Sequence, residues 1–286
     1  MVRPFWNVPQ EMIPMEKPME KPLTLSATGL RDFLQCEALW YLRHWLHLEP
    51  LEKPLPLLAG KLFHDFLQAV HTGADRPLLV FKDRAEMPVE EKAKLYGLAQ
   101  AYLELGWLPE AACEVKVPHG IIDMITDGPV LWEAKVVATY NKQRYVPFTL
   151  SHQVGLYLAD LPEIEDVIIQ VIEKPDVRPR KGEEAASIAR RAYEVSRNDL
   201  ARTFMRERYH RSDFAPEAVL ELCLDKEREI AWKLGGNMEL PWGLSQRGFL
   251  TKPWACTAWG CEFEPVCRTG QVPPGLYTVK PKEEKE

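Results

Sequence analysis

The sequence contains no apolar run of roughly 18 residues, the length that a helix needs to cross a bilayer. Its first residues, Met1 to Trp6, lack the apolar stretch of a secretory signal peptide. Cysteine is scarce, with six in 286 residues. These absences argue against a membrane-spanning protein and against a secreted, disulfide-stabilised one. We therefore expect a cytoplasmic chain whose cysteines are thiols or metal ligands.

The chain also lacks an excess of positive charge, because its formal net charge is −6. This argues against a protein coated in positive charge for duplex DNA. One long segment, residues 174–211, is nevertheless basic, with eleven Lys and Arg against six Asp and Glu. No G-x-x-x-x-G-K-[ST] loop occurs, so the chain contains no recognisable nucleotide-driven motor. A hydrophobic content of 46% and a length of 286 residues suit a substantial globular core.

The two ends differ in composition from the rest of the chain. Residues 1–24 are rich in Pro, Met, Glu and Lys, and the tetrapeptide at 15–18 is repeated at 19–22. Such composition is typical of a flexible arm, and residues 276–286 predict a disordered tail by the same reasoning. Between them we expect a single domain over residues 25–275.

Within that domain, hydrophobic periodicity predicts an alternation of helices and strands. Ser26 or Thr28 can cap a first helix, in which Leu30 and Phe33 are apolar. Further helices are expected through 39–46, 60–70, 90–105, the region of residues 153–157, 183–211 and 215–234. Strands are expected near 112–118, 120–126, 129–137 and 166–173. The order α–β–β–β–α–β predicts an α/β fold.

Three charged residues stand in two short apolar runs that are joined by a turn sequence at 127–129. The runs predict two paired strands. Glu133 and Lys135 are two residues apart and so face the same side of a strand, and Asp123 on the partner strand can face them. Two carboxylates beside an ammonium suit a divalent cation and a lysine that handles a water. Ordinary surface charges on a half-exposed hairpin are the alternative.

The same three residues match the D…E-x-K signature of the PD-(D/E)XK nuclease superfamily, and the chain resembles its RecB-like exonuclease branch. That branch carries G-x-x-x-H upstream, matched by Gly60–His64, and Q-x-x-x-Y downstream, matched by Gln153–Tyr157. The matches occur in family order. The resemblance implies a restriction-endonuclease-like core, in which helices flank a mixed central sheet. It also implies added helical segments and a C-terminal segment that bears cysteines.

The resemblance implies a metal shell as well. Asp123 and Glu133 would bind Mg or Mn together with the backbone carbonyl of Ala134, and His64 would complete the shell. A nitrogen ligand favours manganese over magnesium. Gly60, on the same helix face as His64, would let backbone or substrate approach closely. A core histidine is the alternative interpretation of His64.

Three further roles follow from the resemblance. Lys135 would orient and polarise the attacking water. Gln153 and Tyr157 lie four apart on one helix face, and they would contact the DNA backbone and brace Lys135. An ordinary half-buried helix face is the alternative for Gln153 and Tyr157.

Four of the six cysteines lie near the two ends of the predicted domain. They are Cys36, Cys256, Cys261 and Cys267. Many members of the branch hold a 4Fe–4S cluster with one early and three late cysteines, usually as C-x2-C-x5-C. Here a gap of four residues replaces the gap of two. The resemblance implies an iron–sulfur segment formed by residues 25–50 and 250–270, with a structural zinc or no metal as alternatives.

The resemblance implies a metal-dependent DNA nuclease and favours an exonuclease on single-stranded DNA. An acidic chain with one basic segment and many aromatic residues suits a channel that threads one strand. Stand-alone relatives include CRISPR-associated and phage exonucleases, so DNA repair or recombination is the expected setting. A separate helicase or a recombination or adaptation protein is an expected partner. A non-catalytic DNA-binding or assembly module and an RNA-processing nuclease are the alternatives.

Overall fold

The computed structural model describes residues 23–82, 84, 86–105, 109–139, 151–235, 261–269 and 272–280. Contacts divide the chain into two compact units. The first unit takes its described residues from 23–53 and from 218 onward, and the second unit runs from 54 to 217. Among the described helices, none is long and apolar enough to cross a bilayer. Nearly all of the predicted arm, residues 1–24, lies outside the described residues.

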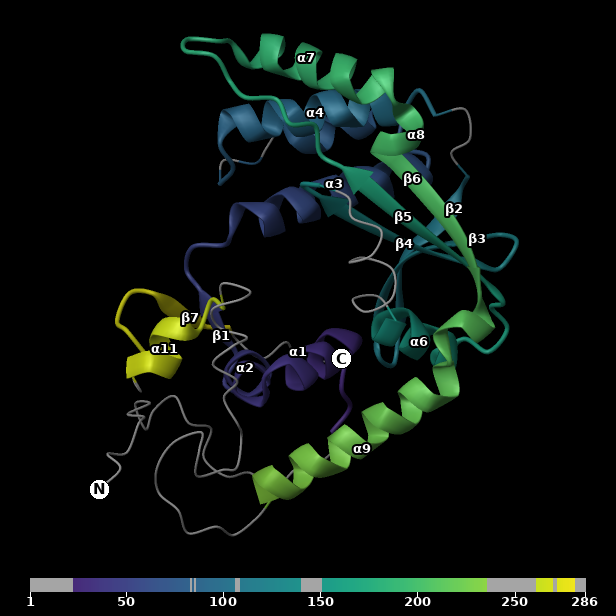
Figure 1. Cartoon of the computed structure of the whole chain (residues 1–286), viewed down its shortest axis with the longest axis vertical. Coiled ribbons are helices and arrows are strands. Elements are labelled where there is room, and N and C mark those ends of the chain that lie inside the picture. Colours follow the sequence, from purple (N-terminus) through teal and green to yellow (C-terminus); the bar gives the residue numbers. More distant parts are fainter. Residues whose placement is uncertain are drawn as a thin grey trace. The chain divides into compact units, whose positions relative to one another are not determined.

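A mixed five-stranded sheet forms the centre of the second unit (Figure 1). Its strands are β2 (Ala111–Val117), β3 (Gly120–Thr126), β4 (Val130–Val137), β5 (Asp166–Glu173) and β6 (Phe204–His210). They lie in sequence order across the sheet, and every neighbouring pair is antiparallel except β4 and β5, which are parallel. The crossover between those two contains a helix, as a parallel connection requires. The predicted α/β class with a mixed central sheet is confirmed.

The fifth strand corrects one prediction. The helix expected over 183–211 ends early, because α7 spans Ala185–Asn198 and a short α8 spans Leu200–Thr203. Strand β6 follows and pairs with β5 along its whole length. Its Arg, Glu and Met residues favour helices in isolation, but pairing with a buried strand outweighs that preference. Phe204 packs edge-on against Tyr102, and the Arg206 guanidinium lies over the Trp132 ring.

Helices cover both faces of this sheet (Figure 1). One face carries α3 (Leu55–His71) and α4 (Val89–Tyr102), with the short η3 (Pro77–Phe81) beside them. Their apolar side chains form the main core with residues of β4, β5 and β6. The opposite face carries α6 (Ser151–Asp160), the crossover helix. The catalytic candidates of β3 and β4 thus stand between helices on both sides.

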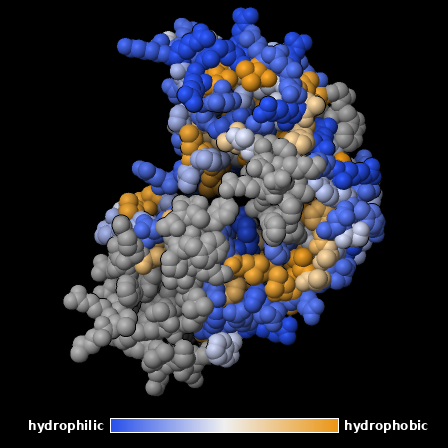
Figure 2. Space-filling view, viewed as in Figure 1, coloured by the Kyte–Doolittle hydropathy of each residue, from blue (hydrophilic) through white to orange (hydrophobic). Residues whose placement is uncertain are grey.

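Helix α7 packs on α4 at very short range. A side chain at Gly97 would place its Cβ 2.2 Å from the carbonyl oxygen of Ala189 and 2.9 Å from the Cβ of Ala192, so only glycine fits there. The contact buries Ile188 and Ala192 in a small separate core with Ala93. Hydrophilic side chains dominate the outer surface of these two helices, with a few apolar residues among them (Figure 2).

The first unit is mainly helical. It contains α1 (Ala27–Gln35), α2 (Glu37–Trp40), the π-helical turn η2 (Tyr41–Trp45) and most of α9 (Pro216–Gly235). The predicted cap is confirmed, because the Ser26 hydroxyl oxygen accepts from the Gly29 N–H at 3.0 Å. The helix expected over 215–234 is confirmed as α9. Later residues add α11 (Glu264–Thr269).

A two-stranded sheet corrects the predicted tail. Residues 276–286 were expected to be disordered, but β7 (Tyr277–Val279) pairs antiparallel with β1 (Leu48–Pro50). The Tyr277 ring also stacks on Phe263, with ring centroids 5.6 Å apart. Composition alone does not predict this strand, because its partner lies more than 220 residues earlier in the chain.

Candidate active site

Asp123 and Glu133 face each other from adjacent strands. Met124 pairs with Trp132 in the β3–β4 register, so the next residues on each strand share the other face of the sheet. The Ala134 N–H donates to Oδ2 of Asp123 at 2.8 Å. Backbone pairing of the two strands ends at Met124 and Trp132. Beyond that point the carboxylate of Asp123 accepts the hydrogen bond from the neighbouring strand. The Asp123 side chain therefore links β3 to β4 where their backbone pairing ends.

The Glu133 side chain is fully buried, with none of its surface exposed. Its Oε1 accepts from Gln153 Nε2 at 2.9 Å and forms an ion pair with Lys135. Its Oε2 has no hydrogen-bond partner among the described residues, although it is buried. Burial, opposed by Lys135 but reinforced by the charge of Asp123, raises the pKa of Glu133 to about 7.

His64, on helix α3, is the next member of this group of side chains and lies beside Asp123. Its Nδ1 lies 3.3 Å from Oδ1 of Asp123. Burial opposes a charge on both groups, but their mutual attraction prevails, so the pKa of His64 is raised and that of Asp123 is lowered. Side-chain exposure is 20% for Asp123 and 31% for both His64 and Lys135, so the site opens towards solvent beside the imidazole and the ammonium.

Lys135 and Tyr157 are two proton donors of the site. Burial opposes the charge of Lys135, but the carboxylates of Glu133 and Asp123 outweigh it and hold the pKa of Lys135 above its ordinary value. Burial, together with the charge of Glu133, raises the pKa of Tyr157 to about 12. Gln153 links Glu133 to Tyr157, because its Nε2, which donates to Glu133, also lies 3.1 Å from the Tyr157 hydroxyl.

The structure thus brings together all of the predicted side chains of this site. They are His64, Asp123, Glu133, Lys135, Gln153 and Tyr157. Ala134 lies between the two charged residues of β4 with its side chain fully buried.

The backbone half of the expectation for Gly60 needs a correction. A Cβ at Gly60 would meet no atom of the described residues within 4 Å, so no described backbone makes a close approach there. The close approach occurs instead at Gly120, where a Cβ would stand 2.9 Å from the Tyr157 ring. Its φ of +157° also disfavours a side chain. Gly120 is therefore the glycine that seats the helix of Gln153 and Tyr157.

Two further residues stand beside the site: Gln68, which the sequence did not single out, and Glu114, for which the sequence allowed either an outer carboxylate of the site or an ordinary strand position. Gln68, one turn after His64 on α3, donates from Nε2 to Oε2 of Glu114 at 3.3 Å. Both line a small pocket with His64 and Asp123. Glu114 has a positive φ of 52°, an uncommon conformation for a side chain other than glycine. The spacing of four residues between His64 and Gln68 is the signal that could have indicated Gln68.

The basic segment 174–211 is largely neutralised by ion pairs. Seven of its eleven cations contact carboxylates. They are Lys174, Arg190, Arg191, Arg197, Arg202, Arg208 and Arg211. Arg178, Arg180 and Lys181 are exposed and have no carboxylate partner among the described residues. The segment therefore presents a short basic turn before α7.

The predicted cluster ligands fall in the first unit as far as they are described. Cys36 caps the end of α1 and is buried, Cys261 lies shortly before α11, and Cys267 lies within α11. Cys256 lies outside the described residues. Burial, followed by the charges of Cys261 and Glu262, raises the pKa of Tyr277 to about 12.

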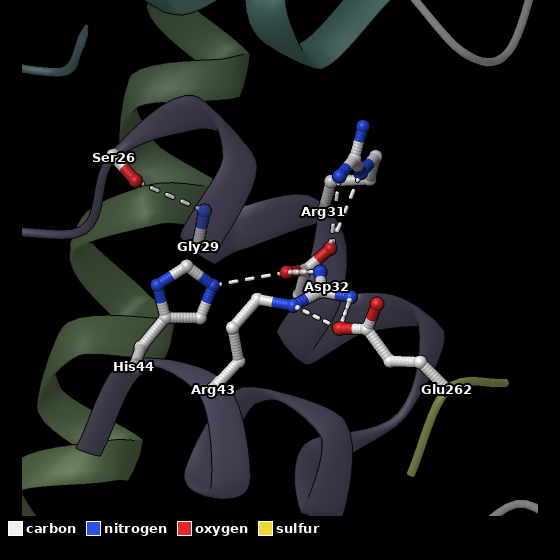
Figure 3. A network of polar contacts seen from close by, with 7 residues as sticks. All are labelled: Ser26, Gly29, Arg31, Asp32, Arg43, His44 and Glu262. Carbon is white, nitrogen blue, oxygen red and sulfur yellow. Dashed lines mark hydrogen bonds and ion pairs between the residues drawn. The ribbon is translucent and has the colours of Figure 1, made fainter. Parts of the chain in front are cut away.

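Buried Asp32 anchors the segment that follows Cys261 (Figure 3). Asp32 is 1% exposed and is surrounded by Arg31, Arg43 and His44, with His44 Nε2 at 2.9 Å from Oδ2. Burial opposes its charge, but His44 and the two arginines hold the pKa of Asp32 below its ordinary value. Arg43 also donates from Nη2 to Glu262 Oε1 at 2.6 Å. One guanidinium therefore joins α1 to the cysteine-bearing segment.

The family of the chain follows from this geometry and from its sequence. The family model of the PD-(D/E)XK nuclease superfamily matches residues 24–268. The chain belongs to this superfamily, and its mixed sheet flanked by helices is of the restriction-endonuclease-like kind. No curated protein matches the chain in sequence.

The donor set fits a divalent metal ion. Two carboxylates and an imidazole lie together, and Oε2 of Glu133 is a buried acceptor that no described protein group satisfies. Oxygen and imidazole ligands suit magnesium and manganese. Superfamily membership agrees with this composition.

Proposed function

We propose that this chain is a metal-dependent deoxyribonuclease that acts as an exonuclease on single-stranded DNA. The observation that carries the proposal is the carboxylate of Glu133. One oxygen is held by Gln153 and Lys135, while the other is buried without a partner among the described residues. A buried acceptor left unsatisfied costs free energy, and a cation in the site would satisfy it.

The ligands that we propose are the carboxylates of Asp123 and Glu133, the imidazole of His64 and the backbone carbonyl of Ala134. When bound, Mg or Mn would neutralise phosphate charge, lower the pKa of a water and stabilise the leaving oxygen. The imidazole favours manganese. The hydrogen bond from the Ala134 N–H keeps the Asp123 carboxylate turned towards Glu133.

The remaining side chains position water and phosphate. Lys135 stays protonated because its pKa is raised, so its N–H donors can orient the attacking water and offset phosphate charge. Gln153 fixes Glu133 through Oε1. Tyr157 keeps its proton because its pKa is about 12. It accepts from Gln153 and can donate that proton to a phosphate oxygen.

The charge distribution supports a single strand as substrate. Duplex binding uses a broad positive face, whereas the cations of segment 174–211 are mostly paired. A single strand needs fewer phosphate contacts and adds stacking on aromatic rings. Arg178, Arg180 and Lys181 are the exposed cations that we assign to the strand. A helicase or a recombination or adaptation protein would act as a separate partner.

For the cysteines we propose a 4Fe–4S cluster on Cys36, Cys256, Cys261 and Cys267, with zinc as the alternative. The network around Asp32 supports this, because Arg43 ties the residue after Cys261 to the helix that ends at Cys36. Protein purified without oxygen should be brown and contain about four irons per chain. Any of the four Cys→Ser variants should bleach it. Colourless protein with stoichiometric zinc would replace the cluster, and metal-free protein with a stable Cys36→Ser variant would remove the site.

Digestion of labelled nucleic acids tests the proposed activity. Single-stranded DNA, duplex DNA and RNA, each labelled at either end, are incubated with manganese or magnesium. We expect release of short products from single-stranded DNA, and a loss of at least about a hundredfold in rate for Asp123→Asn and Lys135→Met. Lys135→Met should still bind manganese, since ammonium is not a ligand. Asp166→Asn, in an exposed pair with Arg208, is the matched control.

Each other outcome of that experiment has a definite meaning. Cleavage of RNA alone would make the chain a ribonuclease on the same fold. DNA binding without any cleavage would make it a non-catalytic module. Cleavage that survives Asp123→Asn would remove this site from the chemistry.

A further inference from the structure

Helix α6 has an anchor of its own, two helical turns away from Gln153. Asp160, the last residue of α6, accepts from the backbone N–H of His119 at 3.0 Å and contacts His119 Nδ1 at 2.7 Å. A carboxylate only accepts, so Nδ1 carries the proton. Both side chains are buried, His119 at 10% and Asp160 at 6% exposure. Both carboxylate oxygens are thus used to hold the turn between β2 and β3.

The next residue along that turn makes a second contact with the same helix. The Tyr157 ring occupies the place where Gly120 would carry a Cβ. Tyr157 and Asp160 are three residues apart and so lie on one face of α6. The turn at 119–120 therefore meets α6 at two adjacent points, one ionic and one steric, and fixes both the position and the rotation of the helix.

This anchor acts on the site through the length of the helix. Gln153 stands seven residues before Asp160, about 10 Å along the axis. Its bond to Glu133 is 2.9 Å long, and a tilt that moves Gln153 by about 1 Å would break it. Residues 140–150, which lead into α6, lie outside the described residues. The described polar anchors at the other end of α6 are Asp160 and Arg211, which donates to the Leu158 carbonyl at 2.7 Å.

The two anchors do different things. Arg211 binds the backbone carbonyls of Leu158 and Leu161, so it caps the C-terminal end of the helix. Asp160 binds His119, the residue before Gly120, through its own side chain. This contact determines which face of α6 is turned towards Glu133.

We propose that Asp160, through His119, is the positioning residue that sets Gln153 on Glu133 and so orders the catalytic carboxylate. The proposal rests on the nuclease function proposed above. Asp160 touches neither substrate nor the reacting atoms, and it works by fixing α6.

The test compares Asp160→Ala with Asp160→Asn. The amide oxygen of asparagine can accept from the His119 N–H, and its NH2 can donate to Nδ1 in the other tautomer, so asparagine preserves both contacts. Val177→Ala opens a small cavity between α4 and α7 and serves as a control for general destabilisation. The three variants and the parent protein are compared for kcat and KM on single-stranded DNA. Manganese affinity is followed by electron paramagnetic resonance, and amide exchange over residues 151–160 is measured.

We expect Asp160→Ala to lower kcat at least about tenfold with KM changed less than about twofold, because misplacement affects the reaction more than substrate binding. Manganese affinity should fall severalfold and amide exchange in α6 should rise. Asp160→Asn should restore most of each, and Val177→Ala should leave all three unchanged. If Asp160→Ala behaves like Val177→Ala, the positioning role is wrong while the nuclease stands. If the parent protein neither cleaves nor binds manganese, the proposed function fails and this inference fails with it.

Discussion

Glu133 should destabilise the metal-free protein at neutral pH, and its replacement by glutamine should stabilise it. Burial raises the pKa of this carboxyl from 4.5 to about 7. The folded chain therefore holds a proton that the unfolded chain has already lost between pH 4.5 and 7. Stability is highest below pH 4.5 and is lost as the pH rises through 7. At about 1.4 kcal/mol per pH unit, the full loss is about 3 kcal/mol.

Glutamine removes this loss but also takes a partner from Lys135. That lysine keeps the Asp123 carboxylate and is 31% exposed, so losing Glu133 costs it about 1 kcal/mol. Gln153 can still donate to the new amide oxygen. The net gain at pH 8 is about 2 kcal/mol, or roughly 4–8 °C in Tm. At pH 5 both forms are nearly neutral at this position, and the difference should shrink below about 1 kcal/mol.

Thermal unfolding in EDTA at pH 5 and pH 8 measures the difference. Asp166→Asn is the matched control, because Asp166 lies on the same sheet in an exposed pair with Arg208 and should leave the midpoint unchanged. Glu133→Gln that is no more stable than the parent at pH 8 would refute the reasoning. An equal gain at both pH values would show that packing, and not ionisation, is responsible.

Three further perturbations have expected outcomes. Gly97→Ala should lower the free energy of unfolding by about 2–3 kcal/mol in urea titrations, because its Cβ would stand 2.2 Å from the Ala189 carbonyl. Burial lowers the pKa of His71, so as the pH falls the unfolded chain binds a proton at this residue before the folded chain does. The free energy of unfolding should therefore fall below pH 6.5. His71→Asn should make the unfolding midpoint less dependent on pH. Arg43→Met should cost about 2–3 kcal/mol by leaving Asp32 buried with weaker partners, and it should speed amide exchange over residues 261–269 more than Arg43→Lys does.

The hairpin that carries the site could be predicted because its signals are local. Alternating residues on each side of the turn at 127–129 define two strands, and the spacing of Glu133 and Lys135 puts them on one face. The structure has β3 and β4 where they were expected. His64, Gln153 and Tyr157 needed a family pattern, because no local rule brings separate helices to one point.

Features made by distant partners could not be predicted in this way. Strand β6 contains helix-favouring residues, and only its pairing with β5 makes it a strand. His119 and Asp160 are 41 residues apart, and nothing in the periodicity of either segment indicates that they meet. The ion pairs that neutralise segment 174–211 use carboxylates from as far away as Glu91 and Glu104, so a charge count along the sequence overstated its free positive charge.

The order of the two units along the chain bears on synthesis at the ribosome. Residues 54–217 hold every strand of the five-stranded sheet, so this unit can fold as soon as they have emerged. The other unit must wait, because β1 has its partner at 277–279 and Arg43 of η2 has its partner at Glu262, and both partners are made after residue 217. For several seconds a nascent chain would carry a complete carboxylate site while Cys36 still lacks the late cysteines. The proposed iron or zinc would therefore be acquired after the carboxylate site has already taken shape.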